Sequence, residues 1–220
     1  EVREFSLTTA ANNANASVNE GDTTFDATTT NSWNTFDTVR GGSGSDTITA
    51  EIANATLRAN MQGVENLVLT DSDAANVSTI NMVDVTGLDS ITIQTSVGRT
   101  AFSNIQTVGE ITLTNTAVSF AAGYTAAATA SAADALTLNL SGVTIADNTA
   151  VSAATNTVET VNIVSLIATN TLNDLQTTLA GTTTVNISGD QDLTVTTAFD
   201  NEVLTINAST AEGDLNLQTG

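Results

Sequence analysis

The amino-acid sequence predicts an all-β protein, and among all-β folds it favours a right-handed parallel β-helix, or β-solenoid. Three observations support this prediction. Short segments recur about every 20 to 25 residues, each segment alternates apolar with polar residues, and the polar positions are mostly Thr or Asn. A β-sandwich is the alternative, because its short strands also follow one another at intervals of about 8 to 12 residues.

The recurring segments begin after Gly63, and their first apolar positions are residues 67, 91, 111, 136 and 161. These positions are 24, 20, 25 and 25 residues apart, and the interval falls to between 8 and 11 residues from position 185 to position 215. The shorter interval is expected if both strands of each coil become visible there. Alternation places Leu, Ile and Val inside the coils and Thr and Asn outside. About seven or eight coils, each about 4.8 Å from the next, would form a rod roughly 35 Å long.

The remaining segments are assigned by local pattern. Residues 5–9 alternate with period two and predict an opening strand, and the Ala- and Asn-rich residues 10–16 predict a loop. Residues 51–62 carry small apolar residues at helical spacing, which predicts a weak amphipathic helix or turn. The small-residue stretches 120–133 and 147–157 predict loops on one face of the molecule.

The stretch Gly41–Thr49 reads GGSGSDTIT and fills every fixed position of the nonapeptide G-G-x-G-x-D-x-U-x, where U is apolar. Its glycines allow φ > 0 and bring carbonyl oxygens close to a cation, and its Asp supplies a charged oxygen ligand. The preceding nine residues keep the Asp and the apolar residue in place but contain no glycine.

We therefore predict calcium binding within residues 21–46, with a purely structural turn as the alternative. The predicted ligands are carboxylates and carbonyl groups from the intact nonapeptide, from the degenerate copy before it and from the turn farther upstream. They are Asp46, Asp37, Gly42, Gly44, Asp22 and Asp26.

Two further pairs of acids lie just after or between predicted strands, Asp71 with Asp73 and Asp190 with Asp192. They are additional candidate calcium ligands. As paired carboxylates they could also flank a glycosidic bond as acid and base. However, acids are common turn residues, and the chain has no His, Cys or Lys from which to build a nucleophilic triad. The sequence therefore predicts a protein that is not an enzyme.

The charge of the chain restricts its partners. Twenty-four acidic residues against four Arg give a net charge of -20, which repels nucleic acids and anionic membranes. Charged residues make up only 13% of the chain and apolar residues 40%, so we expect a folded protein and not a disordered acidic tail. No run of about 18 apolar residues is present, so we expect no insertion into a membrane.

Two features concern the ends of the predicted solenoid. Phe25, Trp33 and Phe36 are three of the eight aromatic residues, and we expect them to form a small hydrophobic cap, with a ligand platform as the alternative. Residues 215–220 still alternate like a strand. An open β-helix end exposes unpaired backbone groups, so we expect continuation of the chain or a subunit contact there. Residues 1–5 lack the features of a signal peptide, which indicates a mature piece, a proteolytic product or an excerpt.

The order of these motifs resembles the repeated β-solenoid segments of bacterial surface-layer (S-layer) proteins and related RTX-type secreted proteins. The segment Phe36–Ile48 (FDTVRGGSGSDTI) followed by Gly63–Leu69 (GVENLVL) carries the resemblance, which covers residues 5 to about 115 in motifs and the remainder in rhythm. It implies type I secretion, calcium-dependent folding outside the cell and assembly into a lattice or adhesive coat. A long nonapeptide array is absent, so we expect one or a few calcium ions.

Together these observations predict an acidic, RTX-like N-terminal segment at residues 1–62 that caps a Thr-rich solenoid at residues 63–220, continuous with it in one elongated unit. The expected function is that of a structural module at the bacterial cell surface, with Ca²⁺ as the cofactor and copies of itself as partners in a lattice or filament. A calcium-dependent adhesin or a carbohydrate-binding module that contacts cell-surface polysaccharide is the first alternative. A polysaccharide-degrading β-helix enzyme is the second.

Overall fold

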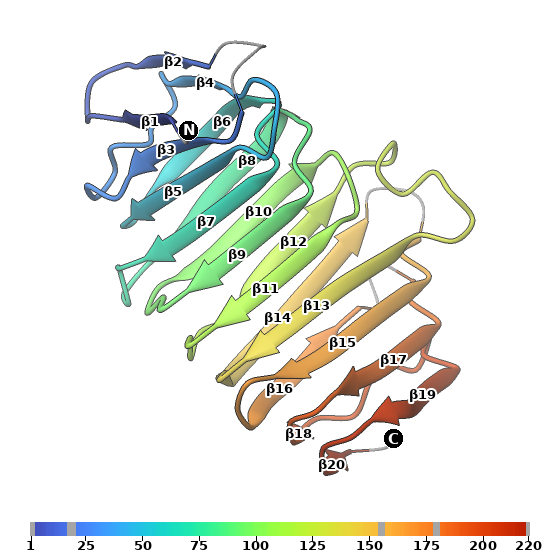
Figure 1. The fold of residues 1–220 in the computed structure, drawn as a ribbon. Coiled ribbons are helices and arrows are strands. Elements are labelled where there is room, and N and C mark those ends of the chain that lie inside the picture. The colour runs from blue at the N-terminus through green and yellow to red at the C-terminus, as the bar shows by residue number, and fades with distance from the viewer. Residues whose placement is uncertain (1–2, 17–20, 154–156, 178–180, 219–220) are drawn as a thin grey trace.

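The computed structural model describes residues 3–16, 21–153, 157–177 and 181–218, and these residues form an all-β parallel β-solenoid. The chain alternates between two sheets of ten strands each, so that one strand of each sheet makes one coil (Figure 1). Every strand pairing found among the described residues is parallel, which excludes the β-sandwich alternative. With ten strands about 4.8 Å apart, the stack is roughly 43 Å long.

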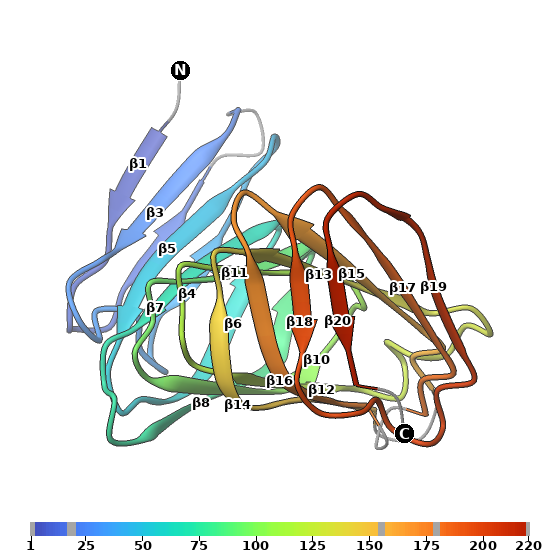
Figure 2. The same ribbon diagram turned by 90° about the horizontal axis from the view of Figure 1, so that it is seen from below.

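The first sheet contains the odd-numbered strands: β1 (Arg3–Ser6), β3 (Thr23–Ala27), β5 (Thr47–Ile52), β7 (Asn66–Asp71), β9 (Ser90–Gln94), β11 (Glu110–Thr114), β13 (Ala135–Ser141), β15 (Thr160–Leu166), β17 (Thr184–Gly189) and β19 (Thr205–Ala211). The second sheet contains the even-numbered strands: β2 (Asn13–Asn15), β4 (Thr38–Arg40), β6 (Thr56–Gln62), β8 (Val77–Thr86), β10 (Arg99–Ile105), β12 (Phe120–Tyr124), β14 (Thr144–Ala153), β16 (Asn170–Gln176), β18 (Leu193–Val195) and β20 (Leu215–Leu217). Strands β1 to β6 belong to the same two sheets as the later strands, so the sheets continue without a break from the predicted N-terminal segment into the predicted solenoid. Figure 2 shows that the strand direction turns gradually from the first coils to the last.

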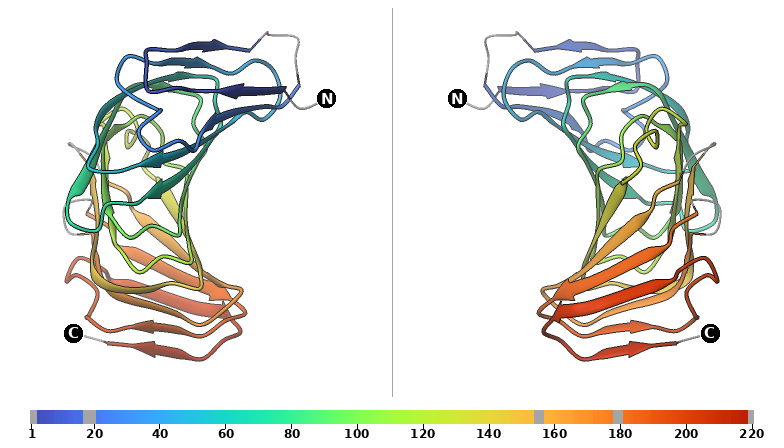
Figure 3. Two further views of the ribbon diagram at one scale, coloured as in Figure 1. Left: turned by 90° about the vertical axis from the view of Figure 1, so that its left-hand side faces the viewer. Right: turned by 90° about the vertical axis from the view of Figure 1, so that its right-hand side faces the viewer.

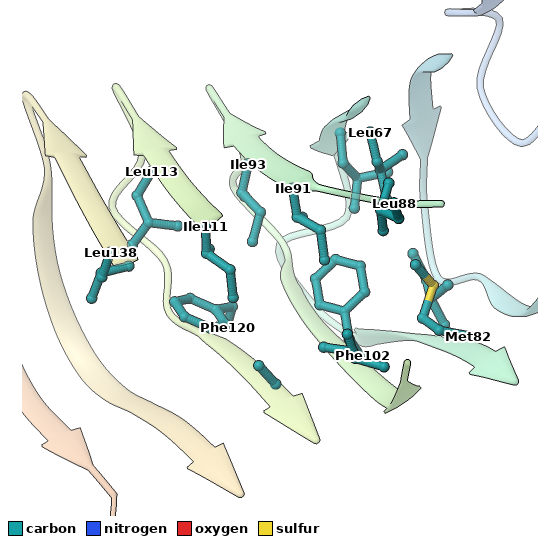
Figure 4. Packing of buried hydrophobic residues seen from close by; sticks show 14 of the residues in the cluster. Leu67, Met82, Leu88, Ile91, Ile93, Phe102, Ile111, Leu113, Phe120 and Leu138 are labelled. Atoms are coloured by element: carbon teal, nitrogen blue, oxygen red, sulfur yellow. The ribbon is translucent and has the colours of Figure 1, made fainter. Parts of the chain in front are cut away.

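The core lies between the two sheets. Figure 4 shows Ile91, Ile93 and Ile111 of the first sheet pointing toward Phe102 and Phe120 of the second. Their neighbours in each strand face outward, as the alternation predicts. Several outward amide and hydroxyl groups bond from coil to coil, because equal positions lie one above the other. The amide of Asn186 donates to Oδ1 of Asn162 at 2.8 Å, and the hydroxyl of Ser90 donates to Oδ1 of Asn66 at 2.8 Å.

The predicted register is confirmed over most of the stack. Leu67 pairs with Ile91, and Ile91 pairs with Ile111. The next step differs, because Ile111 pairs with Leu138 and not with Leu136. Strand β13 begins at Ala135, two residues ahead of Thr137, which pairs with the first residue of β11, so the first apolar residue of the segment is not the residue in register. Such an overhang cannot be read from the spacing of apolar residues alone.

The predicted helix at residues 51–62 is wrong. Strand β5 ends at Ile52, and β6 then buries Leu57, Ala59 and Met61 at every second position. The helical spacing came from counting Ile52 and Ala55 together with Ala59, although these residues belong to two different strands or the turn between them. Parallel partners on both sides favour the extended backbone, so tertiary pairing overrides the weak local pattern.

The two stretches predicted as loops are partly wrong. Strand β12 buries Phe120, Ala122 and Tyr124, and only the residues after it form a loop. Strand β14 continues to Ala153, while residues 154–156 of the second stretch lie outside the described residues. The opening strand begins and ends earlier than predicted, at Arg3–Ser6, and the prediction of a loop at residues 10–16 is wrong where strand β2 (Asn13–Asn15) lies. In addition, no helix in the described part of the chain is long and apolar enough to cross a membrane.

The turns that leave the first sheet often require φ > 0. This conformation is adopted by Asn54 (φ 47°), Asn115 (φ 46°) and Gly142 (φ 66°), which are residue types that tolerate it, but also by Ile167 (φ 66°). A β-branched residue is strained in this region of φ/ψ space. Ile167 is also 80% exposed, so its side chain gains little from burial in return.

We therefore expect Ile167→Asn to stabilise the protein. Asn relieves the strain without loss of core packing, and the expected gain is about 1 kcal/mol, which corresponds to a Tm rise of about 2–4 °C in a chain of this size. Thermal unfolding followed by circular dichroism measures it. Ile167→Val is the control because it keeps the β-branch, and equal Tm values for the two variants would contradict the strain argument.

Candidate functional site

Asp46 of the nonapeptide connects three successive coils. Its side chain is completely buried, with Oδ1 accepting the backbone N–H of Thr23 at 2.7 Å and Oδ2 accepting that of Gly42 at 2.8 Å. Its own backbone N–H donates to Oε2 of Glu65 on the next coil at 2.7 Å. The carboxylate thus satisfies backbone donors that a sharp corner would otherwise leave unpaired.

The glycines of the nonapeptide are required by geometry. A Cβ atom on Gly41 would lie 1.6 Å from the carbonyl oxygen of Gly63, so no side chain fits between these two coils. Gly44 has a φ of 108°, as expected for a glycine turn, and a Cβ atom there would lie 2.6 Å from Oδ1 of Asp22. Gly42 contributes its N–H to Asp46. The motif therefore forms a tight corner that packs against the coils on both sides.

Asp37, in the degenerate copy of the motif, is also buried. Its Oδ1 accepts the backbone N–H of Asn12 at 2.7 Å and the side-chain amide of Asn12 at 2.8 Å. Its Oδ2 accepts the backbone N–H of Asn34 at 2.7 Å. Asp37 consequently fixes the loop before β4 to the coil that precedes it.

The two acids expected in one upstream turn are less enclosed, and the prediction of a turn is wrong for Asp26, which lies within β3, whereas Asp22 precedes that strand. Oδ1 of Asp22 accepts the backbone N–H of Ser45 at 2.9 Å. Oδ1 of Asp26 accepts the hydroxyl of Thr28 at 2.7 Å and its backbone N–H at 2.9 Å, and these bonds lower the pKa of Asp26. Each of the four aspartates is thus bonded mainly to nearby N–H or O–H donors. Within the described ranges, no three acids lie close enough together to form a metal-binding group, so calcium binding stays a prediction.

An acidic residue recurs at the corners that lead into the first sheet, and its structural role was not predicted from the sequence. Asp46, Glu65 and Asp89 each precede a strand of the first sheet and lie level in the pairing register. Asp134 and Glu159 repeat the arrangement on two later coils, where Oε2 of Glu159 accepts the backbone N–H of Asp134 at 2.7 Å. The sequence pattern that could have revealed these corners is an acid two residues before the first inward apolar residue of each segment. It predicts a column of carboxylates along one edge of the sheet.

The pair Asp71 and Asp73 combines two different environments. Asp71 is completely buried, and burial raises its pKa although the hydroxyls of Ser78 and Thr100 and the backbone N–H of Asp73 favour the charged form. The pKa of Asp73 is lowered by the side-chain amide of Asn76, which donates to its Oδ2 at 2.8 Å. Divergent pKa values are typical of acid–base pairs, but the enclosed Asp71 has no surface at which to meet a substrate.

The pair Asp190 and Asp192 lies near the C-terminal end of the stack. Oδ1 of Asp192 accepts the backbone N–H of Asp214 on the next coil at 2.9 Å. Asp190 lines a groove of about 270 Å³ together with Glu212 of the next coil. The groove therefore brings two carboxylates from successive coils to one place, whereas Asp192 is used to join the coils.

Two of the three aromatic residues that were expected to form a cap are buried in the core. Phe25 is completely buried and stacks on Phe5, with ring centroids 5.4 Å apart, and Trp33 is buried beside the same coils. The prediction is wrong for Phe36, which is 79% exposed in the loop between β3 and β4.

Comparisons with protein-family models, with curated proteins and with solved structures found no match for this chain.

We expect Asp71→Asn to stabilise the protein at neutral pH. Because folding raises the pKa of Asp71, the folded state holds this proton more tightly than the unfolded state, and wild-type stability falls as the pH rises from the unfolded pKa of about 3.9 through the folded value. Asn carries no charge to desolvate, and the hydroxyls of Thr100 and Ser78 can turn to accept its N–H groups. The Tm difference between the variant and the wild type should therefore increase from pH 3 to pH 7. A constant difference would contradict this explanation.

We expect the opposite effect from Asp46→Asn. The amide would place its NH2 group against the backbone N–H of Thr23 or Gly42, so at least one charge-assisted hydrogen bond is lost. The expected loss is about 1.5–3 kcal/mol, measured by urea unfolding without calcium. Asp26→Asn is the control, since its two bonds lie within one exposed turn. Equal effects of the two substitutions would contradict the role of Asp46 in joining coils.

Proposed function

We propose that this chain is a structural, non-enzymatic module of an extracellular bacterial coat, which assembles with calcium into an S-layer-like lattice or filament. The apolar face of the last described coil, which we call the open apolar face, carries this proposal, because a further coil from this chain or from a second copy must cover it. Ile206 of β19 is 40% exposed and Leu204 before it is 81% exposed, whereas Val185, the register partner of Ile206 on the preceding coil, is completely buried. The position of Ile206 is thus enclosed on the preceding coil but needs a further coil to cover it here.

The backbone at this end supports the same proposal. Strands β19 and β20 form one edge of each sheet, and no described strand pairs with their outer sides. Unpaired strand edges are templates for pairing with another chain segment. The first coil lies at the opposite end of the stack (Figure 3). End-to-end contact between copies would therefore continue both sheets in one direction and give a filament or one axis of a lattice.

The net negative charge of the chain is the reason why the proposal includes calcium. A net charge of -20 causes copies of the chain to repel one another, and divalent cations reduce this repulsion. Carboxylate oxygens are the ligands that Ca²⁺ prefers. The groove that contains Asp190 and Glu212 spans the last three described coils, so a cation bound between these two residues would lie close to the open apolar face. Asp22, with a carboxylate at the surface of the nonapeptide corner, provides a second place where calcium would bind.

We expect the purified chain to form larger particles in millimolar calcium and to stay monomeric in chelator, as measured by dynamic light scattering with magnesium as the matched cation. Ile206→Lys should abolish this assembly by placing a charge on the open apolar face. Ile167→Lys is the control, because it adds the same charge at an exposed isoleucine on a lateral turn.

Equal particle size in calcium and in chelator would contradict the proposal. So would loss of assembly in both lysine variants, because the effect would then follow from charge and not from the open face. Circular dichroism should show that both variants keep the β fold.

A further inference from the structure

A groove of about 250 Å³ lies between the loop that joins β3 to β4 and the start of β6. These strands lie near the N-terminal end of the stack (Figure 1). Its main lining residues are Asn31, Trp33, Asn34, Thr35, Phe36 and Thr56. All eight residues that line it are uncharged, although the chain carries 24 acids. We call it the Phe36 groove.

The ring of Phe36 is held in its exposed position. The backbone N–H of Phe36 donates to Oδ1 of Asn34 at 3.0 Å, and the backbone N–H of Asn34 donates to Oδ2 of the buried Asp37 at 2.7 Å. Asp37 is in turn bonded to Asn12 on the preceding coil. A fully exposed aromatic ring forgoes roughly 1.5–3 kcal/mol of burial free energy. The loop is therefore fixed so that it presents an apolar ring to solvent without any benefit to the core.

Trp33 lines the same groove and has an unsatisfied polar group. Its side chain is 1% exposed, and its indole Nε1 is buried without a hydrogen-bond partner among the described residues. The hydroxyl of the neighbouring Ser32 is in the same condition, so two of the six such atoms in the described part of the chain belong to consecutive residues. Each buried, unpaired polar group costs about 1–3 kcal/mol. Packing alone does not account for these two residue types at this position.

Neutral hydrogen-bonding groups surround the aromatic side chains. Oγ1 of Thr35 accepts the backbone N–H of Arg58 at 3.1 Å, which leaves its hydroxyl proton available to a ligand. Thr56 also lines the groove, and the NH2 group of Asn34 makes only long bonds of 3.3 and 3.4 Å to backbone carbonyl oxygens. The groove thus combines one apolar face with uncharged donors and acceptors.

We propose that the Phe36 groove binds one neutral pyranose ring of a polysaccharide. A pyranose has an apolar face of C–H groups that can stack on the ring of Phe36, where the π-face is negative. Its hydroxyl groups match the hydroxyl of Thr35 and the amide of Asn34. The volume lies just below the roughly 300–1,000 Å³ of drug-sized sites, so it fits one ring and not an extended peptide. Anionic sugars are repelled by the net charge of the chain. This proposal does not depend on the assembly of the module.

The experiment uses Trp33 as the probe, since it is the only tryptophan in the chain and lines the groove. Intrinsic fluorescence is recorded while glucose, galactose, mannose, their N-acetylamino derivatives and short neutral oligosaccharides are added, with glucuronate as the charged counterpart. At least one neutral sugar should give a saturable change, and glucuronate should bind at least tenfold more weakly. Phe36→Ala should lower the affinity for the neutral sugar at least tenfold without a change in Tm.

Ile167→Ala is the matched control, because it removes an equally exposed apolar side chain far along the chain and should leave the affinity unchanged. The proposal is overturned if none of these neutral sugars gives a saturable change or if glucuronate binds as tightly. It is also overturned if Phe36→Ala binds like the wild type. A change of particle size in Phe36→Ala without any sugar response would assign the groove to contact with a second copy instead.

Discussion

Each coil of this protein can bury its apolar side chains only against the coils above and below it. A single pair of strands, such as β9 and β10, encloses too little apolar area to be stable alone. The stacking register therefore controls the rest of the structure. It aligns Ile91 with Leu67 and Ile111 in the core, and it places Asn162 beneath Asn186 on the outer surface. The same constraint means that the apolar positions of any coil need a neighbouring coil on each side to cover them.

The stacking of the coils also explains where the carboxylates that join them are placed. A corner between sheets turns backbone N–H groups away from the strand ladders, and these groups need acceptors from a neighbouring coil. Asp46, Asp37 and Glu159 accept the backbone N–H groups of Thr23, Asn12 and Asp134 on neighbouring coils. An acidic protein with few bases can thus use its negative charge to join coils, at the cost of repulsion between copies. This repulsion is what links the fold to a proposed dependence on divalent cations.

Much of the fold could be predicted from the sequence, because Leu-Thr-Leu-type alternation fixes the strands and their facing sides. The helix expected at residues 51–62 and the loop expected at Phe120–Tyr124 were wrong because both strands carry a weak strand pattern: the first segment joins the end of β5, a turn and β6, and β12 is rich in Ala and Gly. Such strands are fixed by backbone pairing on both sides and not by their own side chains. For the site, the nonapeptide identified the correct corner, but only the structure showed that Asp46 accepts two backbone N–H groups.

The calcium-dependent structural role is tested most directly by calcium titration of the purified chain, with the bound stoichiometry from calorimetry and the Tm measured on the same samples. One or a few ions should bind per chain, and the Tm should rise more with calcium than with magnesium at equal concentration. Absence of bound calcium, with a Tm that is the same in calcium, magnesium and chelator, would contradict the account.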